Sequence, residues 1–214
     1  MWFLYTSFIE HYCHEKDFRK IDEIFQEMQE KGCKPNAVTY TIAMHALGKA
    51  KQINEALEVY AKMKSDGCLP DAKFYSSLIF ILSKAGRTKD ANEIFEDMKK
   101  HGVMPDVLTY TTMISFACEH SREEDALKLL QKMEEDSCKP NLKTYAPLLK
   151  MCCKKRRMKL ELACSFFKEM VSKGMVPMNA TYKMLVEELN KKSMGEAKEQ
   201  IEKLMSQVKP QESV

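Results

Sequence analysis

Cysteine is the residue type in this sequence with the widest capacity for chemistry, because thiolates bind zinc, form disulfides and act as nucleophiles. The chain has eight cysteines and no C-x-x-C pair. Six of them recur at two fixed places, two residues before a proline (Cys33, Cys68, Cys138) or eight residues after a tyrosine (Cys13, Cys118, Cys153). This spacing predicts small buried apolar side chains in a reducing compartment, with an incidental metal or redox site as the alternative.

A second set of polar residues follows the same recurring tyrosines and prolines. A hydroxyl residue comes directly after four tyrosines, and Asn or Asp comes directly after four prolines. The hydroxyl residues are Thr6, Thr41, Ser76 and Thr111, and the others are Asn36, Asp71, Asp106 and Asn141. Asn and Asp in front of a helix are favourable N-caps, so a purely structural capping role is one interpretation of the second group.

Both sets of positions are fixed by an internal repeat of 35 residues. Pro35, Pro70, Pro105 and Pro140 keep this step, and so do Tyr5, Tyr40, Tyr75, Tyr110 and Tyr145. Several residue types that share one period indicate a repeat architecture. The predicted units are 2–36, 37–71, 72–106, 107–141 and 142–178, followed by a partial unit 179–206 and a polar tail 207–214. The fifth unit contains two extra residues, placed between about residues 154 and 161.

Each unit has the pattern of two amphipathic helices. In the second unit we expect one apolar stripe at Val38, Ile42, Ala46 and Leu47, and another at Ile53, Ala56, Leu57, Tyr60 and Met63. Gly67 suits the left-handed residue after the second helix, and Pro70 prevents that helix from continuing. The sequence therefore predicts an all-α, right-handed α-solenoid of about five helix-turn-helix repeats with a C-terminal capping helix pair.

The net charge of +3 says little about a ligand until the charged residues are assigned to individual helices. The first helices of the second, third and fifth units have no acidic residue, whereas acids gather on the second helices. Glu10, Glu15 and Glu119 are exceptions on other first helices. If the first helices line the groove, it is positive, which suits a phosphate backbone; accidental sorting is the alternative. No apolar run reaches the roughly 18 residues that span a membrane.

The segments "PNAVTYTIAMHALGKAKQINEALEVYAKMKSDGCLPD" and "PDVLTYTTMISFACEHSREEDALKLLQKMEEDSCKPN" resemble P-type pentatricopeptide repeats. The tetratricopeptide family is similar, but its Trp-x-x-Leu-Gly signature is absent. The resemblance covers nearly the whole chain. It implies binding of single-stranded RNA in a plant organelle, one base per repeat, without a cofactor. We expect a mitochondrial location, with the chloroplast as the alternative; the start of the chain does not have the pattern of a transit peptide.

The resemblance also implies which residues contact RNA. Four reading pairs, each specifying one base, would be Thr6 with Asn36, Thr41 with Asp71, Ser76 with Asp106, and Thr111 with Asn141. By the family's rule they select 5′-AGGA-3′, while the fifth pair, Ala146 with Met178, reads nothing. The residues packing against base faces would be Phe3, Val38, Lys73, Leu108 and Lys143. Those contacting phosphates would be Lys49, Lys84 and Lys154.

Two other functions remain to be compared with RNA binding. A helical solenoid can be a protein-interaction scaffold, and organellar RNA-processing proteins are possible partners in either case. Related proteins that edit RNA carry a zinc deaminase with His-x-Glu and Cys-x-x-Cys ligands. This sequence has only His14-Glu15, with no residue between them. We therefore expect no catalytic residues, no metal site and no enzymatic activity.

Overall fold

The computed structural model describes residues 2–15, 17–153 and 157–208. Over these residues the chain forms twelve α-helices and no strand, which confirms the all-α prediction. None of these helices is both long and apolar enough to cross a lipid bilayer. The chain divides into two compact units, residues 1–109 and 110–214, which are described separately below.

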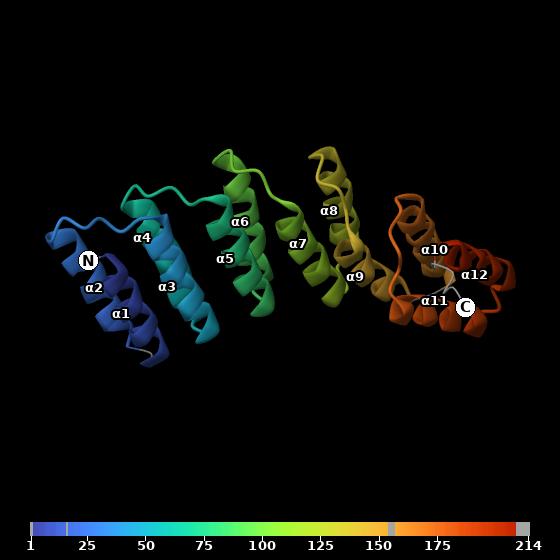
Figure 1. Cartoon of the computed structure of the whole chain (residues 1–214), viewed down its shortest axis with the longest axis horizontal. Coiled ribbons are helices and arrows are strands. Elements are labelled where there is room, and N and C mark those ends of the chain that lie inside the picture. Colours follow the sequence, from blue (N-terminus) through green and yellow to red (C-terminus); the bar gives the residue numbers. More distant parts are fainter. Residues whose placement is uncertain (1, 16, 154–156, 209–214) are drawn as a thin grey trace, which may run out of the picture. The chain divides into compact units, whose positions relative to one another are not determined.

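The first unit is built from helical hairpins that follow the 35-residue repeat. Its helices are α1 (Trp2–Glu15), α2 (Phe18–Glu30), α3 (Ala37–Lys49), α4 (Ile53–Ser65), α5 (Ala72–Lys84) and α6 (Thr88–Lys100). Figure 1 shows α1 beside α2, α3 beside α4 and α5 beside α6, and each of these pairs is in contact. The first helices of successive repeats also touch, α1 with α3 and α3 with α5.

The second unit has the same plan. Its helices are α7 (Val107–Glu119, which begins in the last residues of the first unit), α8 (Glu123–Glu135), α9 (Leu142–Cys153), α10 (Arg157–Ser172), α11 (Asn179–Lys191) and α12 (Gly195–Val208). The two extra residues of the fifth repeat go with a longer α10, which has 16 residues where α8 has 13. The expected tail from residue 207 was placed too early. Because Met205 is buried, it anchors the last turn of α12, which continues to Val208.

The repeated tyrosines lie in the first turns of the first helices and are buried in the core. Tyr40, Tyr75, Tyr110 and Tyr145 are fully buried. The predicted apolar stripe of α4 is confirmed at Ala56, Tyr60 and Met63. That of α3 is confirmed at Leu47 and wrong at Val38. Val38 is 51% exposed, while Tyr40, Ala43, Met44 and Leu47 form the buried face. A first helix packs against its own second helix and against neighbouring first helices, so its buried face is wider than one stripe.

The second helices end as the glycine spacing predicts. Gly67 follows α4 with φ +70°, in the left-handed region where a residue without Cβ is favoured. The Cys68 amide then donates to the Met63 carbonyl at 3.0 Å, which closes the last turn. Ser137 occupies the equivalent place after α8 and adopts φ +58°, although it is not glycine. The repeat therefore imposes this backbone conformation whatever residue is present.

Candidate nucleic-acid interface

The four Asn and Asp residues that follow the prolines are N-caps. Asn36 Oδ1 accepts hydrogen bonds from the amides of Val38 (3.0 Å) and Thr39 (3.1 Å) at the start of α3. Asp71 Oδ1 accepts from the Phe74 amide at 2.8 Å, and Asp106 Oδ1 accepts from the Thr109 amide at 2.7 Å. These four residues therefore cap the first helices, and the hydrogen bonds are compatible both with capping alone and with capping combined with base reading.

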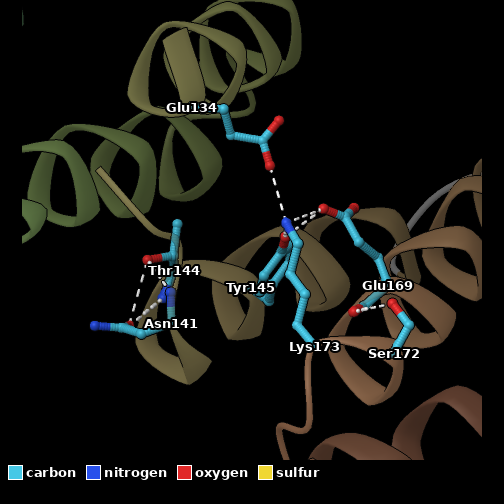
Figure 2. A network of polar contacts seen from close by, with 7 residues as sticks. All are labelled: Glu134, Asn141, Thr144, Tyr145, Glu169, Ser172 and Lys173. Atoms are coloured by element: carbon cyan, nitrogen blue, oxygen red, sulfur yellow. Dashed lines mark hydrogen bonds and ion pairs between the residues drawn. The ribbon is translucent and has the colours of Figure 1, made fainter. Parts of the chain in front are cut away.

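In Asn141, capping uses only one of the two polar atoms of the side chain. Its Oδ1 accepts from the amides of Lys143 (2.9 Å) and Thr144 (3.2 Å). In Figure 2 the amide nitrogen of Asn141 points away from Thr144 and from the helix. Asn141 is exposed, and within the described part of the chain its Nδ2 atom has no hydrogen-bond partner.

All four N-cap residues use their two side-chain polar atoms in the same way. Each side chain commits Oδ1 to its helix and keeps the second atom free of other described residues: Nδ2 in Asn36 and Asn141, Oδ2 in Asp71 and Asp106. Nδ2 is a donor, and the Oδ2 of an ionised carboxylate is an acceptor. Two caps therefore present a donor and two present an acceptor, all on exposed residues.

The hydroxyl members of the reading pairs lie deeper than their partners. Thr6, Thr41, Ser76 and Thr111 are only 7–9% exposed. The Thr41 hydroxyl donates to the Ala37 carbonyl at 2.6 Å, and the Ser76 hydroxyl lies 2.8 Å from the Ala72 carbonyl. Most of each of these side chains is therefore turned into the protein, with a small part at the surface.

The structure joins the two members of the third and the fourth reading pairs through a residue that sequence reasoning missed. Ser76 Oγ lies 2.6 Å from Thr109 Oγ1, which donates to Asp106 Oδ1 at 2.7 Å. Thr111 Oγ1 lies 2.9 Å from Thr144 Oγ1, which donates to Asn141 Oδ1 at 3.3 Å. The signal was available in the sequence, because threonine directly precedes three of the repeated tyrosines.

The residues expected to pack against bases lie at the exposed starts of the first helices. Val38 is 51% and Leu108 63% exposed, which is unusual for apolar side chains, and Lys73 and Lys143 are exposed as well. Phe3 lies in α1, but its side chain falls outside the described part of the structure. Four of the five expected positions are thus accessible to a ligand.

Several lysines on the first helices are exposed and free of described carboxylate partners, although Lys191 on α11 pairs with Glu188 at 2.6 Å. Lys49 and Lys84 form no ion pair with any described residue, and Lys84 Nζ lies 5.7 Å from the centroid of the Phe80 ring. Lys154, the third expected phosphate contact, lies outside the described residues. Partial burial and then the charges of Lys49 and Lys73 lower the pKa of His45. These side chains of α3 and α5 therefore share a region of positive potential.

Some lysines on or just after the second helices pair with acids. Lys62 pairs with Asp22 at 3.1 Å, and Lys20 pairs with Glu23 at 2.7 Å. Figure 2 shows Lys173 donating to Glu134 (3.0 Å), Glu169 (2.5 Å) and the Tyr145 hydroxyl (3.0 Å).

Burial and the hydrogen bond to Glu169 raise the pKa of Tyr145 to about 12, so this tyrosine stays a neutral link between α9 and α10.

The fifth pair has no hydrogen-bonding side chain to offer. Ala146 and Met178 line an open pocket of about 570 Å³ together with Pro147, Met151 and Met184. Ser115, Glu119, Lys150 and Thr181 also line the pocket, and Met178 is 56% exposed. The pocket lies on α7, α9 and α11, the first helices of the second unit.

The cysteines occupy two kinds of place. Cys118, Cys152, Cys153 and Cys164 are buried, whereas Cys33, Cys68 and Cys138 are half-buried, so the prediction of burial is wrong for the group before the prolines. Cys13 lies among side chains that the structure leaves undescribed. Burial raises the pKa of Cys118 and of Cys153 to about 12, which keeps both thiols protonated. Among described residues, no three His, Cys, Asp or Glu side chains form a metal-binding group.

Comparison with known proteins gives matches along the chain. Residues 49–212 match the family model described as the pentacotripeptide-repeat region of PRORP, and residues 3–49 match the PPR repeat family. The pentatricopeptide repeat-containing protein At3g22670, mitochondrial, of Arabidopsis thaliana is 60% identical over 47 residues. That segment is 22% of this chain and 8% of the Arabidopsis protein, so the chain represents a small part of that relative's length.

Solved structures with the same fold come from plants. Maize PPR10 is 24% identical with a TM-score of 0.66, over 95% of this chain and 29% of PPR10. The PPR domain of Arabidopsis thaliana protein-only RNase P 1 is 20% identical with a TM-score of 0.67, over 79% of this chain and 89% of that domain. The two family models together span nearly all of the sequence, and the helical hairpins follow its 35-residue period. The chain belongs to the pentatricopeptide-repeat family.

Proposed function

We propose that this chain binds single-stranded RNA along its first helices, with one base at each of the four reading pairs. The observation that carries the proposal is which side-chain atom each N-cap residue leaves without a hydrogen bond to the helix. Asn36 and Asn141 keep an exposed donor, whereas Asp71 and Asp106 keep an exposed acceptor. Unpaired lysines on the same set of helices supply charge for the phosphates.

The free atoms of the caps favour different bases. The acceptor of Asp71 or Asp106 suits the N–H donors on the Watson–Crick edge of guanine and opposes the N1 acceptor of adenine. The donor of Asn36 or Asn141 suits adenine N1 and opposes guanine N1–H. Because the cap occupies Oδ1, Asn does not offer its acceptor as well. The proposed target remains 5′-AGGA-3′.

Similar proteins support an RNA ligand. Maize PPR10 has been solved in complex with an 18-nucleotide psaJ RNA element, and the PPR domain of Arabidopsis protein-only RNase P 1 in complex with tRNA. The mitochondrial designation of the At3g22670 protein favours a mitochondrial location for this chain. We propose that the repeats act by occupying RNA in its processing, splicing, stabilisation or translation, without catalysing a reaction themselves.

Exchange of Asn and Asp at one cap tests the base reading. Asn141→Asp keeps a side chain that caps α9, so a change in RNA binding reports the atom that the cap leaves free. We expect the fourth-base preference to move from A to G, with a change of about threefold to tenfold in relative affinity. Fluorescence anisotropy with AGGA and AGGG in a uridine-rich single strand, at two salt concentrations, measures this change.

Asn190→Asp is the matched control, because Asn190 is exposed near the end of α11 and outside every reading pair. It adds the same charge and should leave the fourth-base preference unchanged. If binding depends on salt but not on RNA sequence, the result would support phosphate binding by the basic surface and refute base reading by the pairs. Absence of binding to every RNA at low salt would refute RNA binding by this chain and favour a protein-interaction scaffold.

A further inference from the structure

Thr109 and Thr144 lie between the two members of a reading pair. Thr109 belongs to the repeat after Ser76, yet its Oγ1 atom is 2.6 Å from Ser76 Oγ and 2.7 Å from Asp106 Oδ1. In the same way, Thr144 Oγ1 lies 2.9 Å from Thr111 Oγ1 and 3.3 Å from Asn141 Oδ1. Figure 2 shows the contact between Thr144 and Asn141. A hydroxyl from the following repeat thus connects residues that would contact one base.

These linking hydroxyls are closed off from solvent. Thr109 and Thr144 are fully buried, and Ser76 and Thr111 are 9% exposed. A buried hydroxyl without a protein partner is costly, and water does not compete for these contacts. The hydrogen bonds therefore fix the rotamers of both members of each pair.

The direction of the hydrogen bonds decides what each pair presents. An ionised Asp106 only accepts, so Thr109 donates its proton to Asp106. The Ser76 proton then goes to Thr109 or to the Ala72 carbonyl, both inside the protein. Ser76 consequently presents a lone pair, and the third pair shows two acceptors, which suits the N1–H and N2–H donors of guanine.

The fourth pair differs only at its cap. Thr144 donates to Asn141 Oδ1 and accepts from Thr111, so Thr111 presents a lone pair while Asn141 presents its Nδ2 donor. An acceptor beside a donor matches adenine, which has a donor at N6 and an acceptor at N1. The same threonine therefore supports different bases, depending on the cap it contacts.

The second pair has no such link. Phe74 stands where Thr109 and Thr144 stand in their repeats, and it is fully buried without a hydrogen-bonding side chain. Asp71 Oδ1 is held by the Phe74 amide alone, and the Thr41 hydroxyl donates to the Ala37 carbonyl. Nothing described connects Thr41 with Asp71, although both are positioned by their own helices.

We infer that Thr109 and Thr144 are positioning residues for base selection, which act on the RNA through the reading pairs that they join. The inference rests on the proposed function. It predicts that the third and fourth bases are selected more sharply than the second. Thr39 donates to Asn36 Oδ1 at 3.3 Å and would serve the first pair in the same way.

Thr109→Val tests the inference, because valine keeps the shape of threonine and removes the hydroxyl. Relative affinities for AGGA, AGAA and AAGA in a uridine-rich strand report the third-base and second-base preferences separately. We expect Thr109→Val to weaken the preference for G over A at the third base by about threefold to tenfold and to leave the second-base preference intact. Thr109→Ser, which keeps the hydroxyl, should retain both preferences. Thr144→Val should affect only the fourth base.

Each other outcome has a distinct meaning. Full third-base selectivity in Thr109→Val would overturn the positioning role and leave the reading pairs standing. Equal loss at the second and third bases, with a lowered thermal midpoint, would show that Thr109 serves the fold alone and would also overturn the inference. A wild-type chain that binds RNA without any base preference would refute the reading pairs themselves, and this inference with them.

Discussion

At the scale of single residues, the proposed site depends on side chains that cap a helix with one polar atom and leave a second polar atom exposed. Asn36 caps α3 with Oδ1 and keeps Nδ2, and Asp71 caps α5 with Oδ1 and keeps Oδ2. Capping stabilises a helix by about 0.5–2 kcal/mol, so these residues are held in place before any ligand arrives. A capping role and a reading role are therefore compatible in one side chain.

His45 gives a prediction at this scale. Partial burial and the nearby charges of Lys49 and Lys73 lower its pKa in the free protein. An RNA phosphate beside these groups would offset the repulsion and raise that pKa. The complex would then bind the proton more tightly than the free protein, so affinity should increase a few-fold as the pH falls from about 7.5 to about 5.5.

Affinity measured across this pH range, together with an NMR titration of His45, checks the prediction. His45→Gln should remove most of the increase. His101→Gln is the control, because His101 lies just after α6 and its ring is within 3.6 Å of Asp97. An unchanged pH dependence in His45→Gln would contradict the expected placement of phosphate near α3.

At the scale of the helix, one buried tyrosine joins the two helices of a repeat. The hydroxyls of Tyr40 and Tyr110 donate to Asp66 and Asp136 just after the second helices, and Tyr145 donates to Glu169 at 2.6 Å. Each of these bonds links the start of a first helix with the end of its second helix. The recurring tyrosine therefore contributes a hydrogen bond between the two helices as well as a buried ring.

The left-handed residue after α8 gives a prediction about stability. Ser137 adopts φ +58°, whereas Gly102 has φ +72° at the equivalent place after α6. A residue with Cβ is strained by roughly 1 kcal/mol in this region. Ser137→Gly should therefore raise the free energy of unfolding by about that amount.

Gly102→Ser is the reciprocal variant, and a Cβ at Gly102 would meet no atom within 4 Å, so only the backbone term changes. It should lower the free energy of unfolding by a similar amount. Urea denaturation followed by circular dichroism measures both variants. Destabilisation by Ser137→Gly would show that the serine side chain has a role that its backbone conformation does not reveal.

At the scale of the whole molecule, both units expose lysines on their first helices that have no described carboxylate partner. They are Lys49, Lys73 and Lys84 in one unit and Lys143 and Lys150 in the other. Some lysines of the second helices, such as Lys20 and Lys62, pair with acids, whereas Lys89, Lys100 and Lys128 on α6 and α8 are exposed without a described carboxylate partner. The net charge of +3 therefore understates the positive potential available to a phosphate backbone.

The salt dependence of RNA binding tests whether lysines on the first helices contact phosphates. Lys49→Ala and Lys84→Ala should each weaken binding to all sequences alike and reduce the slope of log affinity against log salt by about 0.7. Lys20→Ala, which removes a lysine paired with Glu23, is the control and should leave the slope unchanged. If the three variants behave alike, the lysines of the first helices do not contact phosphates.

The sequence by itself determined the repeat, the helix pairs, the capping residues and the left-handed turns. These features depend on local patterns, such as a proline after Cys68 or an Asn before α3, and local patterns are visible in one chain. The family resemblance supplied the reading pairs, which the structure places at caps and first turns of the predicted helices.

Only the tertiary structure decided which residues meet across repeats. Val38 was assigned to the core, yet α3 exposes it and buries Tyr40 and Met44, because neighbouring first helices cover that side. The Ser76–Thr109 contact joins residues of successive repeats, and a periodic sequence does not state which side chains face each other there. Stacking of one repeat on the next sets these distances, so the contact that connects a reading pair is a property of the fold.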